Sequence, residues 1–219
     1  MKAMILAAGR GERMRPLTDT IPKPMLPING KPLIQYHVER LVMAGINNIV
    51  INHSWMGEQI ESFLGDGHRF NSSIRYSPEG ELPLETAGGI RRALPLLGES
   101  PFIVVNADVW TDYPFDSLAI GPDDLAHLIL VKNPPHHPDG DFCLRGDRVS
   151  LGPGPRLTFA GIGAYRPNLF TGLPEEIYPL GPLLREAISG ENVSGEEYRG
   201  VWQDIGTPER LNQLQSTDK

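Results

Sequence analysis

The sequence of 219 residues lacks the features that mark secreted and membrane-spanning proteins. It contains one cysteine, Cys143, which cannot form a disulfide within the chain, so a reducing compartment is expected. No apolar run approaches the roughly 20 residues of a membrane span, and the apolar start at residues 3–6 is too short for the core of a signal peptide. We therefore expect a cytoplasmic protein that does not associate with membranes.

Basic residues are also in short supply, with 20 Lys and Arg against 27 Asp and Glu and a net charge of −7. This balance argues against nucleic-acid binding, which depends on broad basic surfaces. The first 50 residues nevertheless hold seven Lys and Arg and only three acids, a net charge of +4, which leaves −11 on the rest of the chain. Such a local basic cluster fits either a solvated surface or a site for a compact polyanion such as a nucleoside triphosphate.

A hydrophobic content of 40% over this length predicts a globular chain with a substantial core. In the first half, the hydrophobic pattern predicts strands at residues 2–6, 46–51, 74–77 and 102–105, and helices at 32–45, 56–64 and 86–97, the last with Thr86 as its N-cap. In the second half, it predicts strands at 125–131, 141–144, 149–151, 157–165 and 199–205, and helices at 180–188 and from Pro208. This alternation predicts an α/β fold: a single Rossmann-like domain over residues 1–219, with a mostly parallel twisted sheet and helices on both faces.

Residues 7–31 are expected to form one long loop, because four prolines interrupt any regular helix or central strand there. Gly9 and Gly11 follow the first strand directly, where backbone N–H groups can approach a phosphate. Two familiar phosphate motifs fail: the dinucleotide fingerprint needs a glycine at Met14, and the Walker loop needs Ser or Thr at Pro32. On these residues alone, a phosphate site and a plain tight turn both remain open.

Longer strings of residues are more specific. Residues 6–18 read LAAGRGERMRPLT, and PKPMLP follows at residues 22–27. PLETAGG at residues 83–89, VNAD at 105–108 and WQDIGTPE at 202–209 come later in the chain. Together these motifs resemble the signature of the sugar-1-phosphate nucleotidylyltransferases, and the resemblance spans nearly the entire chain. Members of that family join a nucleoside triphosphate to a sugar 1-phosphate and release pyrophosphate.

The resemblance implies a role for each motif. The first half, about residues 1–110, would bind the nucleotide, and the second half, about residues 111–219, would bind the sugar. The glycine-rich loop would hold the triphosphate through Ala8, Gly9, Gly11, Glu12 and Arg13. Lys23 would contact the α-phosphate region and the incoming phosphate, and the base would face Glu81, Ala87 and Gly88. The sugar would contact Asn106, Gly140, Ala160 and Glu175.

The same resemblance makes Asp108 and Asp204 the two carboxylates that hold Mg²⁺, and Arg13, Lys23, Asp108 and Asp204 the catalytic residues. Without it, an acid after a buried strand would as readily be a turn or helix cap. The chemistry agrees with these residue types. A sugar 1-phosphate has a second pKa of about 6, so its oxygen is already a charged nucleophile at neutral pH and needs no general base. The difficulty lies in bringing two anions together, and Mg²⁺, Lys23 and Arg13 would offset their repulsion.

The chain departs from the family pattern at three places. Glu85 stands where the family usually has glycine, which predicts a different backbone around the base. The Glu-Lys-Pro tripeptide that usually precedes the sugar-binding strand is absent, and residues 150–156 take its place, which makes Arg156 a candidate for the second phosphate anchor. Glu175 and Glu176 could accept hydrogen bonds from the sugar or be exposed charges at the start of a helix.

Two further features have simple interpretations. His136 and His137 resemble half of a metal site, but no third ligand has useful spacing, so a surface loop is expected there. Cys143 lies between Phe142 and Leu144 and is expected to be a small buried hydrophobe.

Within the family, this compact chain most resembles the uridylyltransferases, so the expected partners are UTP and a sugar 1-phosphate, with a monomer as the default state. The slim segment 151–156 leaves room beside the 3-oxygen of the sugar and carries Arg156, which favours N-acetylmuramate α-1-phosphate from peptidoglycan recycling. A mannose-1-phosphate guanylyltransferase is the alternative, since Glu81 can accept hydrogen bonds from guanine as readily as from uracil. A non-catalytic nucleotide-sugar sensor is the alternative from another class, although a sensor needs no paired metal carboxylates.

Overall fold

The computed structural model describes residues 1–80, 82–174 and 177–217. The helices in this part of the chain are α1 (Leu33–Met43), α2 (Gly57–Leu64), α3 (Glu85–Leu97), α4 (Leu180–Ser189) and α5 (Pro208–Thr217). The strands are β1 (Lys2–Leu6), β2 (Pro27–Ile28), β3 (Lys31–Pro32), β4 (Asn48–His53), β5 (Ser73–Pro78), β6 (Phe102–Asn106), β7 (Val109–Thr111), β8 (Ala126–Val131), β9 (Phe142–Arg145), β10 (Arg148–Ser150), β11 (Arg156–Tyr165), β12 (Val193–Glu197) and β13 (Trp202–Asp204).

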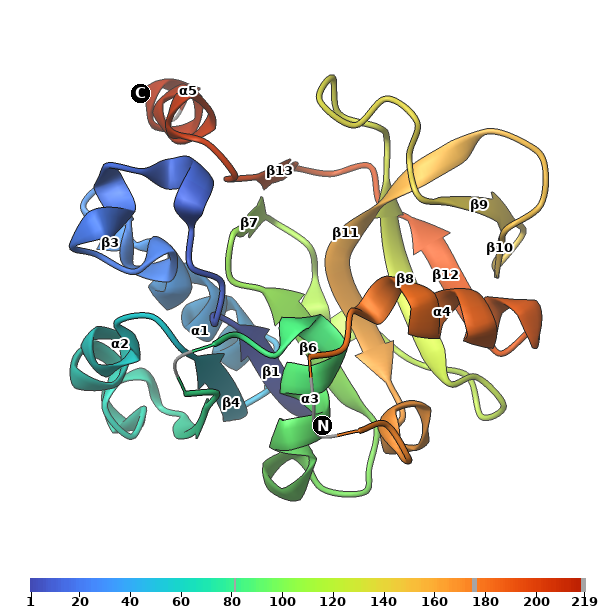
Figure 1. The fold of residues 1–219 in the computed structure, drawn as a ribbon, viewed down its shortest axis with the longest axis horizontal. Coiled ribbons are helices and arrows are strands. Elements are labelled where there is room, and N and C mark those ends of the chain that lie inside the picture. Colours follow the sequence, from blue (N-terminus) through green and yellow to red (C-terminus); the bar gives the residue numbers. More distant parts are fainter. Residues whose placement is uncertain (81, 175–176, 218–219) are drawn as a thin grey trace.

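The central sheet has nine strands in the order β5-β4-β1-β6-β11-β8-β12-β10-β9, and it runs across the middle of the molecule in Figure 1. The strands β5, β4, β1 and β6 are parallel to one another. Beyond β6, the antiparallel strand β11 follows, and β8 and β12 form a further parallel pair. The predicted α/β fold is confirmed, and its continuous parallel part lies in the first half of the chain.

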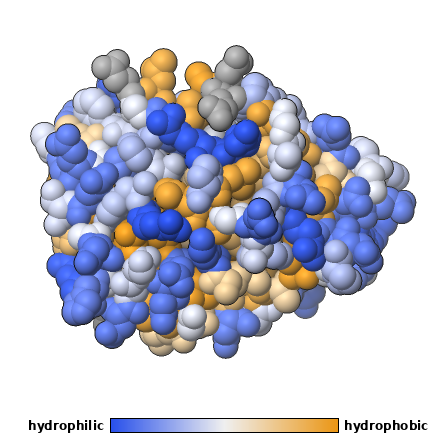
Figure 2. Space-filling view, turned by 90° about the horizontal axis from the view of Figure 1, so that it is seen from below, coloured by the Kyte–Doolittle hydropathy of each residue, from blue (hydrophilic) through white to orange (hydrophobic). Residues whose placement is uncertain are grey.

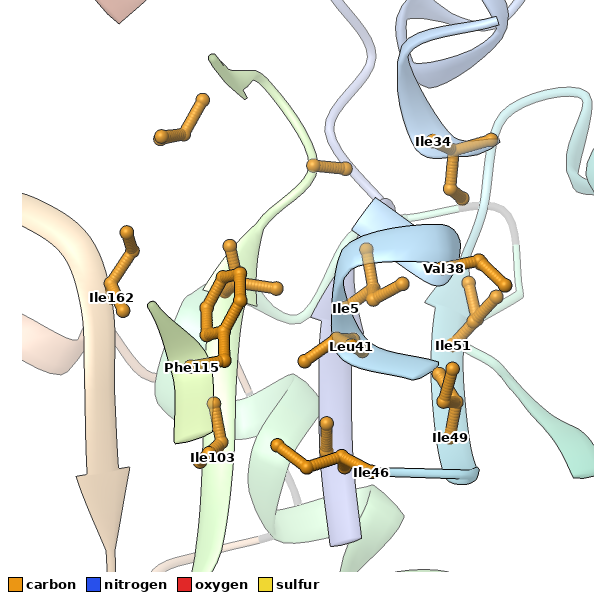
Figure 3. Packing of buried hydrophobic residues seen from close by; sticks show 14 of the residues in the cluster. Ile5, Ile34, Val38, Leu41, Ile46, Ile49, Ile51, Ile103, Phe115 and Ile162 are labelled. Atoms are coloured by element: carbon orange, nitrogen blue, oxygen red, sulfur yellow. The ribbon is translucent and has the colours of Figure 1, made fainter. Parts of the chain in front are cut away.

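Helices cover both faces of this sheet, as the sequence predicts. Successive residues of a strand point to opposite faces, and in β1 the side chains of Ala3 and Ile5 belong to the cluster with α1 and α2. Met4, between them, belongs to the cluster with α3 and α4. Figure 3 shows side chains of α1 lying over those of β1 and β4 in the first cluster. Because both faces are buried, the central strands are apolar at nearly every position.

A third cluster joins the two ends of the chain. Met14 and Leu26 of the N-terminal loop pack with Ile205 and with Leu211 and Leu214 of α5. Gln215 Nε2 donates a hydrogen bond of 2.8 Å to the carbonyl oxygen of Pro27, 188 residues earlier in the chain. Figure 1 shows α5 beside this loop. The C-terminal segment is thereby fixed next to the glycine-rich loop.

The structure differs from the sequence-based expectations in local details. Thr86 was expected to cap α3, but the helix begins at Glu85 and Leu84 occupies the N-cap position. Strand β12 was not predicted, because its sequence VSGEE has one large apolar residue, and it forms by parallel pairing with β8. The loop at residues 7–31 contains three short 3-10 turns and ends in the hairpin β2–β3. Cys143 is 3% exposed, which confirms its expected burial.

The surface carries scattered apolar side chains rather than a broad apolar area on the face shown in Figure 2, where polar residues separate the hydrophobic ones. Met43, Leu82, Ile177 and Val201 are among the large hydrophobic residues that are more than half exposed. No helix in the described part of the chain has the length and apolarity needed to cross a membrane.

The position of Ile5 in the central strand β1 leads to a stability prediction. Ile5 is fully buried between the sheet and α1, so Ile5→Ala should lower the free energy of unfolding by about 2–5 kcal/mol, measured by urea denaturation. Met43→Ala is the matched control, because Met43 is 86% exposed at the end of α1, and it should change stability by less than about 0.5 kcal/mol. Equal effects of the two substitutions would contradict the described core.

Candidate active site

The carboxyl ends of the four parallel strands lie next to one another at one edge of the sheet, which is where α/β sheets bind ligands. Glu79 follows β5, Asn52 lies near the end of β4, Ala7 follows β1, and Asn106 ends β6 just before Asp108. All five residues line a cavity of about 640 Å³. The rest of the lining includes Leu6, residues 8–14, Lys23, Pro24, Leu82, Pro83, Glu85, Thr86, Ala107 and Gly206.

The glycine-rich loop after β1 forms one wall of the cavity. Gly11 has φ +67°, and a Cβ there would lie 3.0 Å from Thr18 Cγ2 and 3.1 Å from Lys23 Cβ. The carbonyl oxygen of Gly11 accepts hydrogen bonds from Met14 N (2.9 Å) and Thr18 Oγ1 (2.8 Å). A glycine is therefore needed for the tight fold of this loop. Four other residues that the resemblance assigned to the triphosphate also line the cavity: Ala8, Gly9, Glu12 and the exposed Arg13.

An ion pair joins this loop to the end of β6. Lys23 Nζ donates a hydrogen bond of 2.5 Å to Asp108 Oδ2, across 85 residues of sequence. The Lys23 side chain is 11% exposed, whereas that of Asp108 is 33% exposed. A buried ammonium group needs a partner of opposite charge, and Asp108 provides it at the wall of the cavity. The structure thus brings together two of the residues expected to act in catalysis.

The small sheet β7–β13 places Asp204 close to Asp108. These strands are antiparallel, and Asp204 pairs with Val109, the residue after Asp108. Ile205 N also donates a hydrogen bond of 2.8 Å to the carbonyl oxygen of Asp108. The two predicted metal-binding carboxylates therefore lie on adjacent backbone segments.

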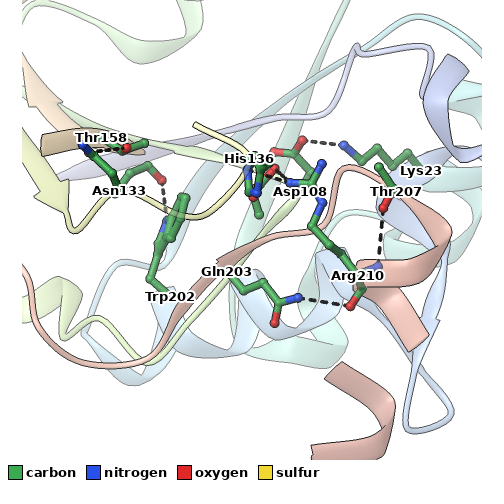
Figure 4. A network of polar contacts seen from close by, with 11 residues as sticks. Lys23, Asp108, Asn133, His136, Thr158, Trp202, Gln203, Thr207 and Arg210 are labelled. Carbon is green, nitrogen blue, oxygen red and sulfur yellow. Dashed lines mark hydrogen bonds and ion pairs between the residues drawn. The ribbon is translucent and has the colours of Figure 1, made fainter. Parts of the chain in front are cut away.

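Two basic side chains contact the Asp204 carboxylate. Arg210 Nη1, from α5, donates a hydrogen bond to Asp204 Oδ2, and His136 Nε2 lies 2.9 Å from Asp204 Oδ1. Arg210 Nη1 is also 2.9 Å from His136 Nε2. Figure 4 shows Lys23, Arg210 and His136 converging from three separate segments on the region of Asp108. The expectation of a plain surface loop at His136 was therefore incomplete: this histidine is 41% exposed but belongs to the polar network of the site.

These carboxylates fit a hard divalent cation. Asp204 Oδ1 is buried and accepts no hydrogen bond of good geometry in the described part of the chain, although His136 Nε2 lies 2.9 Å from it. A carboxylate oxygen of this kind is a ligand that Mg²⁺ accepts. The described residues hold no group of three or more His, Cys, Asp or Glu side chains placed to bind a metal. Mg²⁺ in phosphate-processing sites is usually held by one or two carboxylates together with substrate phosphates and water. Asp108 and Asp204 match that smaller ligand set.

A buried carboxylate, Glu79, organises the part of the cavity near β4 and β5. Glu79 Oε1 accepts a hydrogen bond of 2.6 Å from Asn52 Nδ2, and Oε2 accepts one of 2.7 Å from Leu84 N. Asn52 Oδ1 in turn accepts a hydrogen bond of 2.9 Å from Ala7 N. Burial raises the pKa of Glu79, and the hydrogen bonds from Leu84 and Asn52 partly oppose that shift. The side chains of Glu79 and Asn52 together link the residue after β1 with β4 and with the segment that leads into α3.

Helix α3 packs tightly against this carboxylate. A Cβ on Gly89 would lie 2.2 Å from Glu79 Oε1 and 2.9 Å from Asn52 Nδ2, so this position needs glycine. At the start of the helix, Glu85 lines the cavity with φ +60°. The left-handed region costs a residue with a side chain roughly 1–2 kcal/mol. Glu85 thus adopts a conformation that glycine would adopt without strain, and the expected difference from the family's backbone at this position stays a prediction.

Two of the three residues expected at the base, Ala87 and Gly88, lie outside the lining of the cavity. Ala87 and Gly88 are buried behind the cavity wall, and their N–H groups donate hydrogen bonds of 3.0 and 3.1 Å to the carbonyl oxygen of Tyr178. Glu81 lies outside the described residues.

Among the described residues expected at the sugar, one lines the cavity and two do not. Asn106 lines the cavity, whereas Ala160 is fully buried in an irregular part of β11, and its carbonyl oxygen accepts a hydrogen bond of 2.9 Å from Trp202 Nε1. Gly140 belongs to the loop between β8 and β9, and neither Gly140 nor Ala160 lines the cavity. Arg156 is exposed at the start of β11, also outside the lining. Glu175 and Glu176 lie outside the described residues.

Sequence reasoning missed four residues of this site: Asn52, Glu79, His136 and Arg210. A signal existed for the first two, because each is a polar residue at the end of a strand predicted to be parallel. Arg210 follows directly on the last motif, WQDIGTPE, but nothing in that string shows which way its side chain turns. His136 contacts a residue 74 positions away, so only the tertiary fold reveals its place.

Comparisons with known proteins identify the family and the fold of the chain. Residues 2–142 match the nucleotidyl transferase family. The chain is 53% identical to the N-acetylmuramate alpha-1-phosphate uridylyltransferase of Neisseria meningitidis, over 99% of this chain and 97% of that protein. It is 33% identical to the mannose-1-phosphate guanyltransferase of Hypocrea jecorina, over 95% of this chain and 61% of that protein. The solved inositol-1-phosphate CTP transferase of T. maritima has the same fold, with a TM-score of 0.82, 18% identity and coverage of 98% of this chain and 94% of that one.

The burial of Glu79 predicts a pH dependence of stability. The pKa of the Glu79 carboxyl in the folded protein is raised above its ordinary value of 4.5. At pH values above 4.5, this carboxyl is therefore protonated in a larger fraction of folded molecules than of unfolded ones. The free energy of unfolding of the wild type should therefore fall, relative to that of Glu79→Gln, as pH rises from 4.5 until the folded-state carboxyl has ionised. Urea denaturation at pH 4.5, 5.5, 6.5 and 7.5 measures this difference.

Glu99→Gln is the control for this experiment, because Glu99 is exposed after α3. Its stability relative to the wild type should stay constant over the same pH range. A constant difference between the wild type and Glu79→Gln as well would contradict the raised pKa of Glu79.

Proposed function

The chain belongs to the nucleotidyl transferase family, and on that premise we propose that it transfers UMP from UTP to N-acetylmuramate α-1-phosphate, giving UDP-N-acetylmuramate and pyrophosphate. The 53% identity to the Neisseria meningitidis enzyme over nearly the whole of both chains supports the choice of both substrates. The reaction would take place in the cytoplasm, during the recycling of peptidoglycan sugars.

The observation that carries this proposal is the Lys23–Asp108 ion pair at the wall of the cavity, with Asp204 on the adjacent strand. Transfer of a nucleotidyl group needs cations where the α-phosphate meets the attacking phosphate, because both are anions. Lys23 would place its ammonium group at that point. Arg13, which lines the cavity from the glycine-rich loop, would add charge along the triphosphate.

Asp108 and Asp204 would hold Mg²⁺, which would offset the charge of the reacting phosphates and polarise the α-phosphate. No side chain of the chain needs to remove a proton, because the acceptor phosphate is already a dianion in large part at neutral pH, with a second pKa of about 6. The protein's own contribution is to orient two anions in line and to hold compensating charge beside them.

The base would lie against the wall formed by Glu79, Asn52 and residues 82–86. Both oxygens of Glu79 accept one hydrogen bond each within the protein, and each retains a lone pair. A carboxylate acceptor suits the imide N–H of uracil and also the adjacent N–H groups of guanine. The 33% identity to a mannose-1-phosphate guanyltransferase supports GTP and mannose 1-phosphate as the alternative pair.

The first prediction concerns the metal. Asp108→Asn should lower kcat by roughly a hundredfold or more at saturating UTP, because a neutral amide holds Mg²⁺ poorly and a bound metal supplies several kcal/mol of charge stabilisation. The Mg²⁺ concentration for half-maximal activity should rise. Asp116→Asn is the matched control, since Asp116 is exposed in a short 3-10 turn away from the cavity, and it should leave both values unchanged. Near-wild-type turnover of Asp108→Asn at limiting Mg²⁺ would remove Asp108 from the metal site.

The second prediction concerns the substrates. With UTP and GTP present together, and with equal concentrations of N-acetylmuramate α-1-phosphate, N-acetylglucosamine 1-phosphate, glucose 1-phosphate and mannose 1-phosphate, UDP-N-acetylmuramate should dominate the products identified by mass. Pyrophosphate release measures the total rate and requires Mg²⁺. If GDP-mannose dominates, the alternative pair is correct. If no combination releases pyrophosphate, the chain is a sensor rather than an enzyme.

A further inference from the structure

Arg210 occupies an unusual position for a cation. It is the third residue of α5, in the first turn, where the positive end of the helix dipole disfavours a positive charge. Its side chain is nevertheless 13% exposed and turned away from solvent onto Asp204 and His136. Leu211 and Leu214 anchor the same helix against the N-terminal loop. The position of the helix therefore places this guanidinium group beside Asp204 and His136.

The backbone beside Arg210 leaves room for this group. A Cβ on Gly206 would lie 2.7 Å from Arg210 Nη2 and 3.1 Å from Asp204 Oδ2. Gly206 itself lines the cavity. The guanidinium group is therefore separated from the cavity by a residue without a side chain, and both of the contacts described above use Nη1 rather than Nη2.

The two candidate metal carboxylates have the same electrostatic arrangement. Asp108 is paired with Lys23, and Asp204 is paired with Arg210. In each pair the cation is the more buried member, with side-chain exposures of 11% for Lys23 and 13% for Arg210. A carboxylate that binds a divalent cation no longer needs its protein partner, so the partner's N–H groups become available to an anion. The site therefore contains two largely buried cations, each paired with one of the candidate metal carboxylates.

The absence of the Glu-Lys-Pro tripeptide leaves a second cation for the acceptor phosphate unassigned. Neither Arg156 nor Arg210 lines the cavity. Arg156 is exposed at the start of β11, whereas Arg210 lies against Gly206, which does line the cavity. We propose that Arg210, from α5, is the residue that binds the phosphate of the acceptor sugar 1-phosphate. This inference rests on the proposed function, and it concerns the phosphate, so it holds whichever of the four sugars is preferred. The planar fork of the guanidinium suits two oxygens of one phosphate.

The experiment compares Arg210→Gln and Arg210→Lys with Arg156→Gln, which tests the alternative anchor, and with Arg199→Gln as control, all in the 219-residue chain with Mg²⁺ present. Initial rates give KM for the acceptor and for the nucleoside triphosphate separately, using the pair that the wild type prefers. Loss of a charge-assisted hydrogen bond should raise the acceptor KM of Arg210→Gln by about 10- to 100-fold. The KM for the nucleotide should change less than about twofold. Arg210→Lys keeps the charge but loses the planar fork of the guanidinium, so its acceptor KM should lie between those of the wild type and Arg210→Gln.

Arg199→Gln is the matched control, because the Arg199 side chain is 76% exposed and pairs with Glu197 away from the cavity. It should leave both KM values within about twofold of the wild type. Calorimetric titration with the sugar 1-phosphate, and with the same sugar lacking phosphate, provides a readout besides turnover. The ratio of the two affinities should fall in Arg210→Gln and stay unchanged in Arg199→Gln. Thermal unfolding of each variant checks that the fold is retained.

Three outcomes would overturn the proposal. A parallel rise in the KM values for acceptor, nucleotide and Mg²⁺ in Arg210→Gln would mean that Arg210 only positions Asp204. A rise in acceptor KM in Arg156→Gln alone would mean that Arg156, at the start of β11, binds the acceptor phosphate instead. Unfolding of both Arg210 variants at assay temperature would mean that Arg210 serves to stabilise the fold rather than to bind the phosphate. The failure of the proposed function looks different, since the wild type itself would then use another substrate pair or none.

Discussion

The Lys23–Asp108 ion pair is the interaction on which the site depends, because it joins two segments that are remote in sequence at a residue whose backbone also binds a third segment. Lys23 comes from the loop after β1, Asp108 follows β6, and the carbonyl of Asp108 receives Ile205 N from the C-terminal part. A nearly buried ammonium group is costly without a carboxylate beside it. The pairing therefore fixes the loop against the strand, and the third hydrophobic cluster, with α5, holds the same loop from the other side.

Charge compensation extends from this pair across the rest of the cavity. Asp204 has Arg210 and His136 as neighbours, and at the far end Glu79 relies on hydrogen bonds from Asn52 and Leu84 rather than on a cation. The contrast has a physical consequence. Asp108 and Asp204 each pair with a cationic side chain, Lys23 and Arg210, that could also bind an anionic substrate. Glu79 is held by a backbone N–H and an amide, so it fixes the wall of the cavity that would face the base.

The fold makes these contacts possible by aligning strand ends. Four parallel strands finish at one edge, so Glu79, Asn52, Ala7 and Asp108 meet there although long stretches of sequence separate them. The second half adds the antiparallel strand β11 beside β6 and returns through β13 to pair with β7. That return is what brings Asp204, and with it Arg210, to a site otherwise built by the first half of the chain.

The sequence by itself determined the α/β class, most of the strands and helices, the loop at residues 7–31, and the cavity-lining positions of Lys23, Asp108 and the glycine-rich loop. These follow from hydrophobic periodicity and from contiguous motifs, which are local properties. Only the tertiary structure decided that β12 exists, that α3 begins at Glu85, that Ala87 and Gly88 donate N–H hydrogen bonds to Tyr178, and that His136 and Arg210 belong to the site. The reason is that such features depend on partners far away in the chain: β12 needs β8 for its hydrogen bonds, and a charged side chain turns toward whichever opposite charge the completed fold places within reach.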